Sequence, residues 1–188
     1  MRIVSGKFKG KIIRNPTDKT TRPLKDRVRE SIFNILEHSK NEKINLKGKI
    51  VLDMFSGSGS FGIECLSRGA KHVYFLENYK NVINILKTNI EELQLSNFTT
   101  IYEKNAYDIL KTDIKNHHID LVFIDPPFID KYLHNLLRNI KKQDLVDKNT
   151  LVIFHRKKKT NDKFDKDFVV LREQSYGLSK IIFGKFLF

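Results

Sequence analysis

The stretch Val51-Leu52-Asp53-Met54-Phe55-Ser56-Gly57-Ser58-Gly59 decides the fold class of this chain. Its first half is an apolar run that reads as a buried strand, and its second half is a glycine turn. Glycine lets the backbone turn tightly and approach a ligand, because no Cβ stands in the way. Residues 57–62 match the pattern G-x-G-x-x-G, which between a strand and a helix is typical of nucleotide-like cofactor sites. The stretch therefore predicts the first strand-turn-helix unit of an α/β sheet.

Strands and helices alternate through most of the chain that surrounds this unit. A first helix is expected over residues 25–38, where apolar residues recur at helical spacing. The expected strands are residues 49–54, 72–76, 99–103, 119–124 and 150–155. The expected later helices are residues 60–68, 81–95, 106–110 and 132–140. This alternation predicts right-handed crossovers and a mostly parallel sheet.

The two ends of the chain follow a different pattern. Residues 168–172 and 180–183 are β-prone and leave no room for a helix between them, which predicts a C-terminal antiparallel hairpin and seven strands in all. Short β-prone runs around Gly6 and Gly10 predict a small N-terminal hairpin. We expect a single domain over residues 1–188, with an N-terminal hairpin extension (1–24) and an α/β core (25–188).

The charge of the chain is unusual. Lys and Arg total 35 against 22 Asp and Glu, a formal net charge of +13. Such an excess attracts polyphosphate surfaces, and residues 1–29 contain only two acids, Asp18 and Asp26. A membrane surface would require an amphipathic helix with bulky apolar residues, which this segment lacks. Nucleic acid is the favoured partner, and a merely solvated lysine-rich surface is the alternative.

The length of the chain, its apolar runs and its single cysteine indicate the size of the fold and where the protein acts. A chain of 188 residues is long enough for one sizeable core. Its apolar runs are far shorter than a bilayer span, and its start lacks the pattern of a secretory signal. The single cysteine, Cys65, excludes an intramolecular disulfide and falls at a position expected to be buried in a helix. We expect a cytoplasmic protein with no membrane association.

Two acids at consecutive strand ends favour S-adenosylmethionine as the cofactor. Asp53 lies four residues before Gly57, where its carboxylate can face the glycine turn or a cofactor ammonium. Glu77 ends the next strand, where a carboxylate can accept both ribose hydroxyls. Each acid could instead be a structural cap or a solvated strand end. Asn105 and Ala106 follow the third strand, where Asn105 could contact adenine or cap the short helix after it.

The tetrapeptide Asp125-Pro126-Pro127-Phe128 ends the apolar run of residues 121–124. Hydrogen bonds from an exocyclic amine to the Asp125 carboxylate and the Pro126 carbonyl would aim the nitrogen lone pair at a methyl donor. Phe128 would stack on the base that carries the amine. Catalysis would then rest on positioning and electrostatics, with no covalent intermediate. A strand-terminating Asp-Pro-Pro turn is the structural alternative.

These motifs resemble those of the RsmD family, bacterial enzymes that methylate the N2 amine of one guanine in 16S ribosomal RNA. The segments that carry the resemblance are residues 1–6, 21–23, 26–34, 52–59, 67–70, 120–128 and 176–177. The resemblance implies a Rossmann-like class I fold that uses S-adenosylmethionine. It also implies a 16S ribosomal RNA substrate, within an assembled small subunit or a late precursor. We expect the protein to act as a monomer.

The resulting site prediction has three parts. The predicted catalytic residues are Asp125, Pro126, Pro127 and Phe128. The predicted cofactor-binding residues are Arg22, Asp53, Phe55, Ser56, Gly57, Ser58, Gly59, Glu77, Asn78, Asn105 and Ala106. The predicted RNA-binding residues are Lys7, Lys9, Lys11, Arg22, Arg27, Arg29 and Tyr176, although Arg27 and Arg29 could be solvated helix charges and Tyr176 a packed turn aromatic.

Several other functions are compatible with part of the pattern. The nearest alternative is an adenine-N6 methyltransferase acting on DNA or RNA, because the tetrapeptide suits either amine. A nicotinamide-dependent oxidoreductase would share the glycine turn, but the chain lacks an evident hydride-site constellation. A non-catalytic RNA-binding module is supported by charge alone. The scattered histidines predict no metal site, and His155 is expected to be structural or to face RNA.

Overall fold

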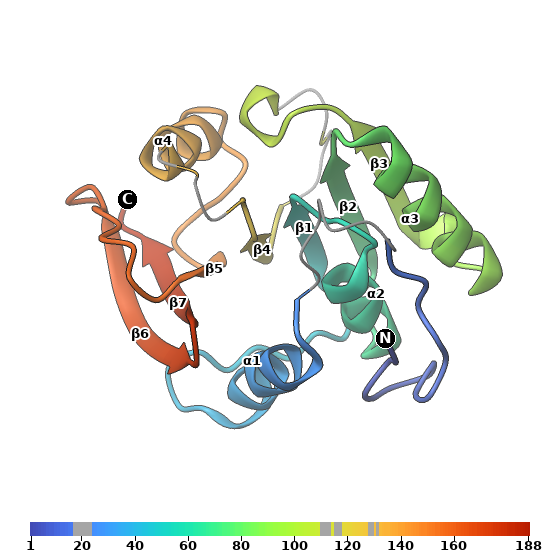
Figure 1. Ribbon diagram of the computed structural model, residues 1–188. Coiled ribbons are helices and arrows are strands. Elements are labelled where there is room, and N and C mark those ends of the chain that lie inside the picture. The colour runs from blue at the N-terminus through green and yellow to red at the C-terminus, as the bar shows by residue number, and fades with distance from the viewer. Residues whose placement is uncertain (17–23, 110–113, 115–117, 128–129, 131) are drawn as a thin grey trace.

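A computed structural model describes residues 1–16, 24–109, 114, 118–127, 130 and 132–188. Its seven-stranded sheet has the order β3-β2-β1-β4-β5-β7-β6, and Figure 1 labels these strands and the helices around them. The strands are β1 (Ile50–Met54), β2 (His72–Glu77), β3 (Thr99–Glu103), β4 (Leu121–Ile124), β5 (Leu151–Lys157), β6 (Phe168–Tyr176) and β7 (Ser179–Phe186). The first five strands are parallel, which confirms the prediction.

The helices occupy the predicted intervals, with ends shifted by a few residues. They are α1 (Asp26–His38), α2 (Ser60–Ser67), α3 (Lys80–Glu92) and α4 (Leu133–Lys142), with the 3₁₀ turns η1 (Ser96–Phe98) and η2 (Ala106–Asp108). Cys65 is buried in α2, as predicted. None of the helices in the described part of the chain is long and apolar enough to cross a bilayer.

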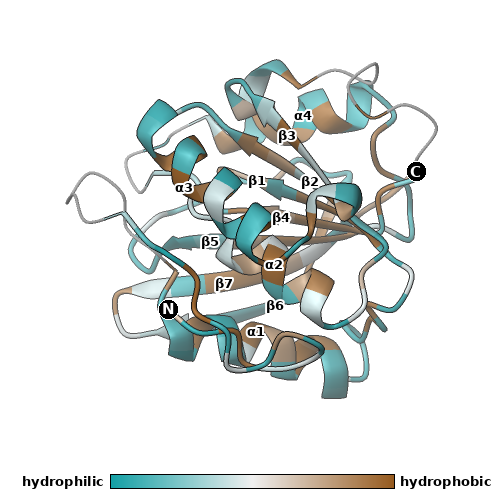
Figure 2. Ribbon diagram, turned by 90° about the vertical axis from the view of Figure 1, so that its right-hand side faces the viewer, coloured by the Kyte–Doolittle hydropathy of each residue, from teal (hydrophilic) through white to brown (hydrophobic). Residues whose placement is uncertain are grey.

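Alternate residues of a strand point to opposite faces of the sheet. Both sets are buried here, so the sheet is covered on both faces. Val51, Phe123 and Ile153 belong to the core beneath α1, α2 and α3. Leu52, Val122 and other residues one position away belong to the core beneath α4 and η2. Strands buried on both faces are near-continuous apolar runs, and Figure 2 shows brown, hydrophobic stretches in the strands and both teal and brown positions in the helices.

The C-terminal hairpin closes the sheet as predicted. Strand β7 inserts between β5 and β6 and runs antiparallel to both. The register of β6 against β7 shifts between Val170 and Arg172, a bulge within the edge strand. The result is a sheet in which β7 alone runs opposite to the other six strands.

The predicted N-terminal hairpin is present in a reduced form, as a turn with little strand pairing. Only Arg2 and Ile12 form a β-bridge among the described residues outside the sheet. The buried carboxylate of Glu64 in α2 accepts hydrogen bonds from the backbone nitrogens of Val4, at 2.8 Å, and Ser5, at 3.0 Å. Because these donors are directed at α2, the segment docks on this helix.

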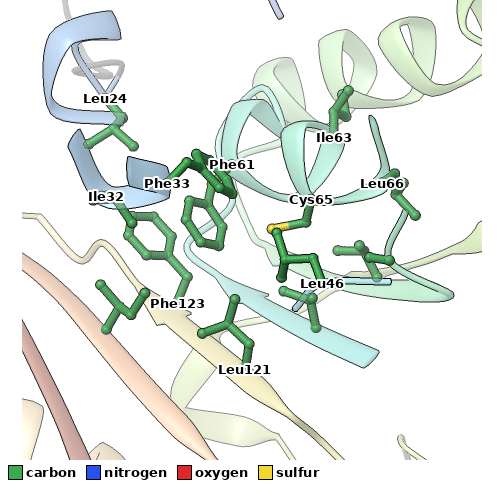
Figure 3. Packing of buried hydrophobic residues seen from close by; sticks show 14 of the residues in the cluster. Leu24, Ile32, Phe33, Leu46, Phe61, Ile63, Cys65, Leu66, Leu121 and Phe123 are labelled. Carbon is green, nitrogen blue, oxygen red and sulfur yellow. The ribbon is translucent and has the colours of Figure 1, made fainter. Parts of the chain in front are cut away.

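Aromatic rings connect α1, α2 and the sheet. The ring of Phe61 in α2 stacks on Phe33 in α1 with a centroid distance of 5.1 Å, and on Phe123 in β4 with a centroid distance of 3.9 Å. Figure 3 shows these rings at the centre of the apolar packing. This stack fixes the first turn of α2 against β4, and therefore fixes the glycine turn relative to the end of β4.

Candidate functional site

A cavity with a volume of about 560 Å³ lies at the carboxyl ends of the central strands. Strand order reverses between β1 and β4, and in open α/β sheets ligands bind at such a point. The lining residues are Pro16, Leu24, Asp53, Phe55, Ser56, Gly57, Ser58, Ser60, Phe61, Glu77, Asn78, Tyr79, Phe123, Asp125, Pro126, Pro127 and His155. The glycine turn and the Asp-Pro-Pro segment therefore share one cavity.

The glycine turn has the backbone conformation that its sequence predicts. Gly57 has a φ of 57° and Gly59 a φ of 83°, both in the left-handed region that favours glycine. Gly59 also forms the N-cap of α2. A Cβ at Gly59 would lie 2.4 Å from Cδ1 of Leu86, so the turn approaches α3 closely. The turn presents its backbone to the cavity from β1 to α2.

Asp53 lies almost completely buried beneath this turn. Its Oδ2 accepts a hydrogen bond of 2.9 Å from the backbone nitrogen of Gly62. Burial raises the pKa of the Asp53 carboxyl well above its usual range, and the charges of Asp125 and Glu77 raise it further, against the opposing effect of the Gly62 bond. A cation bound in the cavity would relieve this cost, because it would stabilise the ionised form of Asp53.

Glu77 organises the turn from the end of β2. Its Oε2 accepts a hydrogen bond of 2.8 Å from the backbone nitrogen of Gly57. Its Oε1 accepts bonds from the backbone nitrogens of Asn78, at 2.9 Å, and Tyr79, at 3.0 Å. Carboxylate oxygens have about four acceptor positions, so the bracing of the turn leaves capacity for a ligand hydroxyl.

Asp125 lies at the end of β4 on the same face of the sheet as Asp53 and contacts a histidine. Its Oδ1 is 2.8 Å from Nδ1 of His155 in β5. The His155 side chain is 6% exposed and that of Asp125 is 17% exposed. Both line the cavity, so the pair belongs to the site.

The chain after Asp125 is braced by neighbouring elements. Pro126 is buried, and the carbonyl of Pro127 accepts a hydrogen bond of 2.9 Å from the Asp130 nitrogen. Asp130 in turn binds the Tyr107 hydroxyl through Oδ2, at 2.5 Å, and accepts a bond of 2.8 Å from the Arg156 guanidinium through its backbone oxygen. Burial and the Asp130 carboxylate raise the pKa of Tyr107, which keeps its hydroxyl a donor. Phe128 lies outside the described residues.

The charge of the cavity is opposite to that of the chain. Three carboxylates line it, those of Asp53, Glu77 and Asp125, and none of the described lining residues is Lys or Arg. The chain as a whole carries a formal charge of +13. The cavity is therefore suited to a cationic ligand and unsuited to a pyrophosphate.

The predicted cofactor residues fall into three groups. Those that line the cavity are Asp53, Phe55, Ser56, Gly57, Ser58, Glu77 and Asn78, whereas Gly59, Asn105 and Ala106 are absent from its described lining. Asn105 caps η2, because its side-chain oxygen accepts a hydrogen bond of 3.1 Å from the Tyr107 nitrogen. Of the two alternatives for Asn105, capping is the one seen. Arg22 lies outside the described residues.

Those predicted RNA-binding residues that the structure describes lie in different surroundings. Lys7, Lys9, Lys11 and Arg27 are exposed. The backbone nitrogen of Lys7 binds the Ser67 carbonyl at 2.7 Å, which places Lys7 at the end of α2 away from the cavity. Tyr176 is half-buried and its hydroxyl bonds to the hydroxyl of Ser31, so it packs against α1.

Arg29 neither faces solvent as a helix charge nor is exposed to RNA. Its side chain is fully buried, and its guanidinium donates to the backbone oxygen of Arg2 and to Asp26. Burial lowers the pKa of Arg29, an effect that the charges of Asp26 and Glu64 oppose. The expectation that Arg29 faces RNA, or is a solvated helix charge, is corrected by this burial: Arg29 fastens the N-terminal segment to α1.

His155 is a polar residue of the site that the sequence-based prediction leaves out. It was assigned a structural or RNA-facing role, yet it lines the cavity beside Asp125. The signal was its position: β4 and β5 are parallel, and Ile124 pairs with Phe154. The residues that follow this pair, Asp125 and His155, therefore lie side by side. In the described part of the chain, no group of His, Cys, Asp or Glu side chains is placed to hold a metal ion.

Comparison with known proteins gives consistent matches over nearly the whole chain. The family model described as Conserved hypothetical protein 95 matches residues 1–185. The chain is similar to Ribosomal RNA small subunit methyltransferase D of Haemophilus influenzae, with 31% identity over 95% of this chain and 90% of the relative. It is also similar to YlbH of Bacillus subtilis, with 30% identity over 98% of both chains.

A solved structure gives the same result for the fold. The structure of HI0767 from Haemophilus influenzae superposes with a TM-score of 0.78 and 30% identity, and the match covers 100% of this chain and 98% of that one. The likeness extends over the sheet, its helices and the C-terminal hairpin. The expected Rossmann-like class I fold is thereby confirmed.

Proposed function

The chain belongs to the family described as Conserved hypothetical protein 95, the RsmD family, and from this premise we propose its reaction. It transfers a methyl group from S-adenosylmethionine to the N2 amine of a specific guanine in 16S ribosomal RNA. The RNA is presented in an assembled small subunit or a late precursor. The observation that carries the proposal is the acidic cavity in which the glycine turn and Asp125 meet.

The character of the cavity supports S-adenosylmethionine over a nicotinamide dinucleotide. S-adenosylmethionine supplies a methyl group on a positively charged sulfur and carries an ammonium group. Asp53 and Asp125 would stabilise these positive charges, and Glu77 would accept a hydrogen bond from a ribose hydroxyl. A dinucleotide needs its pyrophosphate at the N-terminus of α2. In the glycine turn that precedes this helix, the Gly57 nitrogen already donates to Glu77.

The residues at the end of β4 would prepare the amine for reaction. An amine conjugated to a base is a poor nucleophile, because its lone pair is delocalised into the ring. The Asp125 carboxylate and the Pro126 carbonyl would accept its two protons in hydrogen bonds and favour a pyramidal nitrogen. After transfer the nitrogen is cationic, and Asp125 or water takes one proton, which restores a neutral amine.

The identity of the base is the finer part of the proposal. Guanine N2 and adenine N6 are both planar amines that Asp125 and Pro126 could hold. The name of the Haemophilus influenzae relative and the motifs of the N-terminal half support ribosomal RNA. A guanine in a loop or bulge would be accessible without the cost of leaving a duplex stack. Adenine-N6 methylation remains the second candidate function.

We expect the purified protein to place N2-methylguanine in 16S RNA of small subunits that lack this mark. The protein is incubated with methyl-labelled S-adenosylmethionine and naked 16S RNA, small subunits, whole ribosomes or DNA, and the nucleosides are separated by mass spectrometry. One labelled N2-methylguanosine per RNA supports the proposal. Label in N6-methyladenine would establish the second candidate instead, and no label in any substrate would reject both.

A further inference from the structure

We propose that His155 is a positioning residue that holds the Asp125 carboxylate in the orientation that accepts the substrate amine. The inference rests on the proposed methyl transfer and adds a residue to its machinery. Its basis is the contact of 2.8 Å between His155 Nδ1 and Asp125 Oδ1 at the wall of the cavity. His155 acts through Asp125 and does not take part in the transfer itself.

The sheet gives the two residues unequal rigidity. His155 lies inside β5, which pairs with β4 on one side and with β7 on the other, where His155 is opposite Ile181. Asp125 is the first residue after β4 and leads into the Asp-Pro-Pro segment. The His155 side chain, on a strand paired at both edges, can therefore fix the orientation of the Asp125 side chain at the start of a loop.

Repulsion within the cavity explains why Asp125 needs such a partner. The negative charge of Asp125 raises the pKa of the buried Asp53 carboxyl, so the two acids are close enough to interact. Without a donor, Asp125 could lower this repulsion by turning toward solvent. A carboxylate only accepts hydrogen bonds, so His155 Nδ1 is the donor of the pair. The bond occupies Oδ1 and leaves Oδ2 to accept the amine.

The choice of histidine also agrees with the charge of the cavity. Lysine or arginine at this position would hold Asp125 equally well, but it would place a full positive charge beside a cationic cofactor. An imidazole, unlike an ammonium or a guanidinium, has a neutral form that still carries an N–H donor. His155 can therefore orient Asp125 while the cavity keeps its acidic character.

The test compares His155→Leu, which removes the donor, with His155→Asn, which keeps an N–H at the position of Nδ1. We expect His155→Leu to lower the single-turnover rate of methyl transfer about 10- to 100-fold, because the amine is misplaced. His155→Asn should recover the rate to within about threefold of wild type. Affinities for S-adenosylhomocysteine and for the RNA, measured by titration, should stay within about threefold in both variants.

His72→Leu is the matched control, because His72 is another histidine of the sheet, bonded to Thr100 at 2.9 Å at the opposite end of β2. It should leave the transfer rate unchanged. Equal losses in the Leu and Asn variants, or a wild-type rate in both, would overturn the role of His155. If His155→Leu does not fold, His155→Ala, which also removes the donor, takes its place in the comparison. A wild-type protein that methylates no substrate would instead reject the proposed function.

Discussion

Replacing Asp125 with alanine should slow methyl transfer by about 100-fold or more, the loss expected when an oriented polar group at a reacting centre is removed. The carboxylate lies at the end of β4 in the wall of the acidic cavity. Without it, the substrate amine loses the acceptor that aligns its lone pair. The measurement is the single-turnover rate with the RNA substrate and labelled S-adenosylmethionine.

Binding of the cofactor separates this effect from a general loss of structure. Asp125→Ala should bind S-adenosylhomocysteine within about fivefold of wild type, because the glycine turn, Asp53 and Glu77 remain in place. Asp165→Ala is the control, since Asp165 is a surface residue paired with Arg138. It should transfer at the wild-type rate. An Asp125→Ala protein that methylates as fast as wild type would exclude Asp125 from catalysis.

Replacing Asp53 with asparagine should weaken cofactor binding about tenfold or more, and at the same time stabilise the free protein by about 1 kcal/mol or more. Asp53 is 1% exposed and close to two other acids. Asparagine can keep the hydrogen bond from Gly62 without a buried charge. The cofactor loses a charged partner, and calorimetry and thermal unfolding measure the two effects.

The gain in stability should depend on pH. The pKa of Asp53 in the folded protein lies above its ordinary value of 3.8. Between these two pKa values, the folded protein holds a proton on Asp53 that the unfolded chain has lost. The free energy of unfolding of the wild type therefore falls as pH rises from about 4 through the raised pKa. Asp53→Asn lacks this fall, so the two proteins should be equally stable at the acidic end and diverge toward neutral pH.

A second aspartate supplies a contrast of opposite sign. Asp120 lies at the other end of β4, where it binds the ammonium group of Lys49 at 2.7 Å and the backbone nitrogen of Ile50 at 2.9 Å. Asp120→Asn should lower stability and leave cofactor affinity unchanged. If Asp53→Asn behaved in the same way, the buried carboxylate would be structural and not a cofactor contact.

The order of elements could be predicted from the sequence because the central strands are distinct apolar runs. Strands buried on both faces, such as β1 and β4, leave little ambiguity of type. The glycine turn was equally plain, since only glycine readily adopts the positive φ of residues 57 and 59. The cavity follows from these two features, because β1 and β4 are neighbours in the sheet.

Side-chain partners between distant segments were less predictable. Arg29 reads as a solvated helix charge, yet its partner is a backbone oxygen of the N-terminal segment. His155 and Asp125 are thirty residues apart in sequence and meet only because β4 and β5 pair. The contact between Tyr107 and Asp130 likewise joins η2 to the chain that follows β4. Helical or strand periodicity carries no information about such pairs.

The proposed reaction requires the donor methyl group and the substrate amine to meet beside Asp125. The most direct test is a crystal structure with S-adenosylhomocysteine, in which the distance from the ligand sulfur to the Asp125 carboxylate is measured. We predict a separation of about 7 Å or less, enough for one hydrogen-bonded nitrogen and the transferred methyl group. A ligand bound outside the cavity, or a sulfur directed away from the end of β4, would contradict the account.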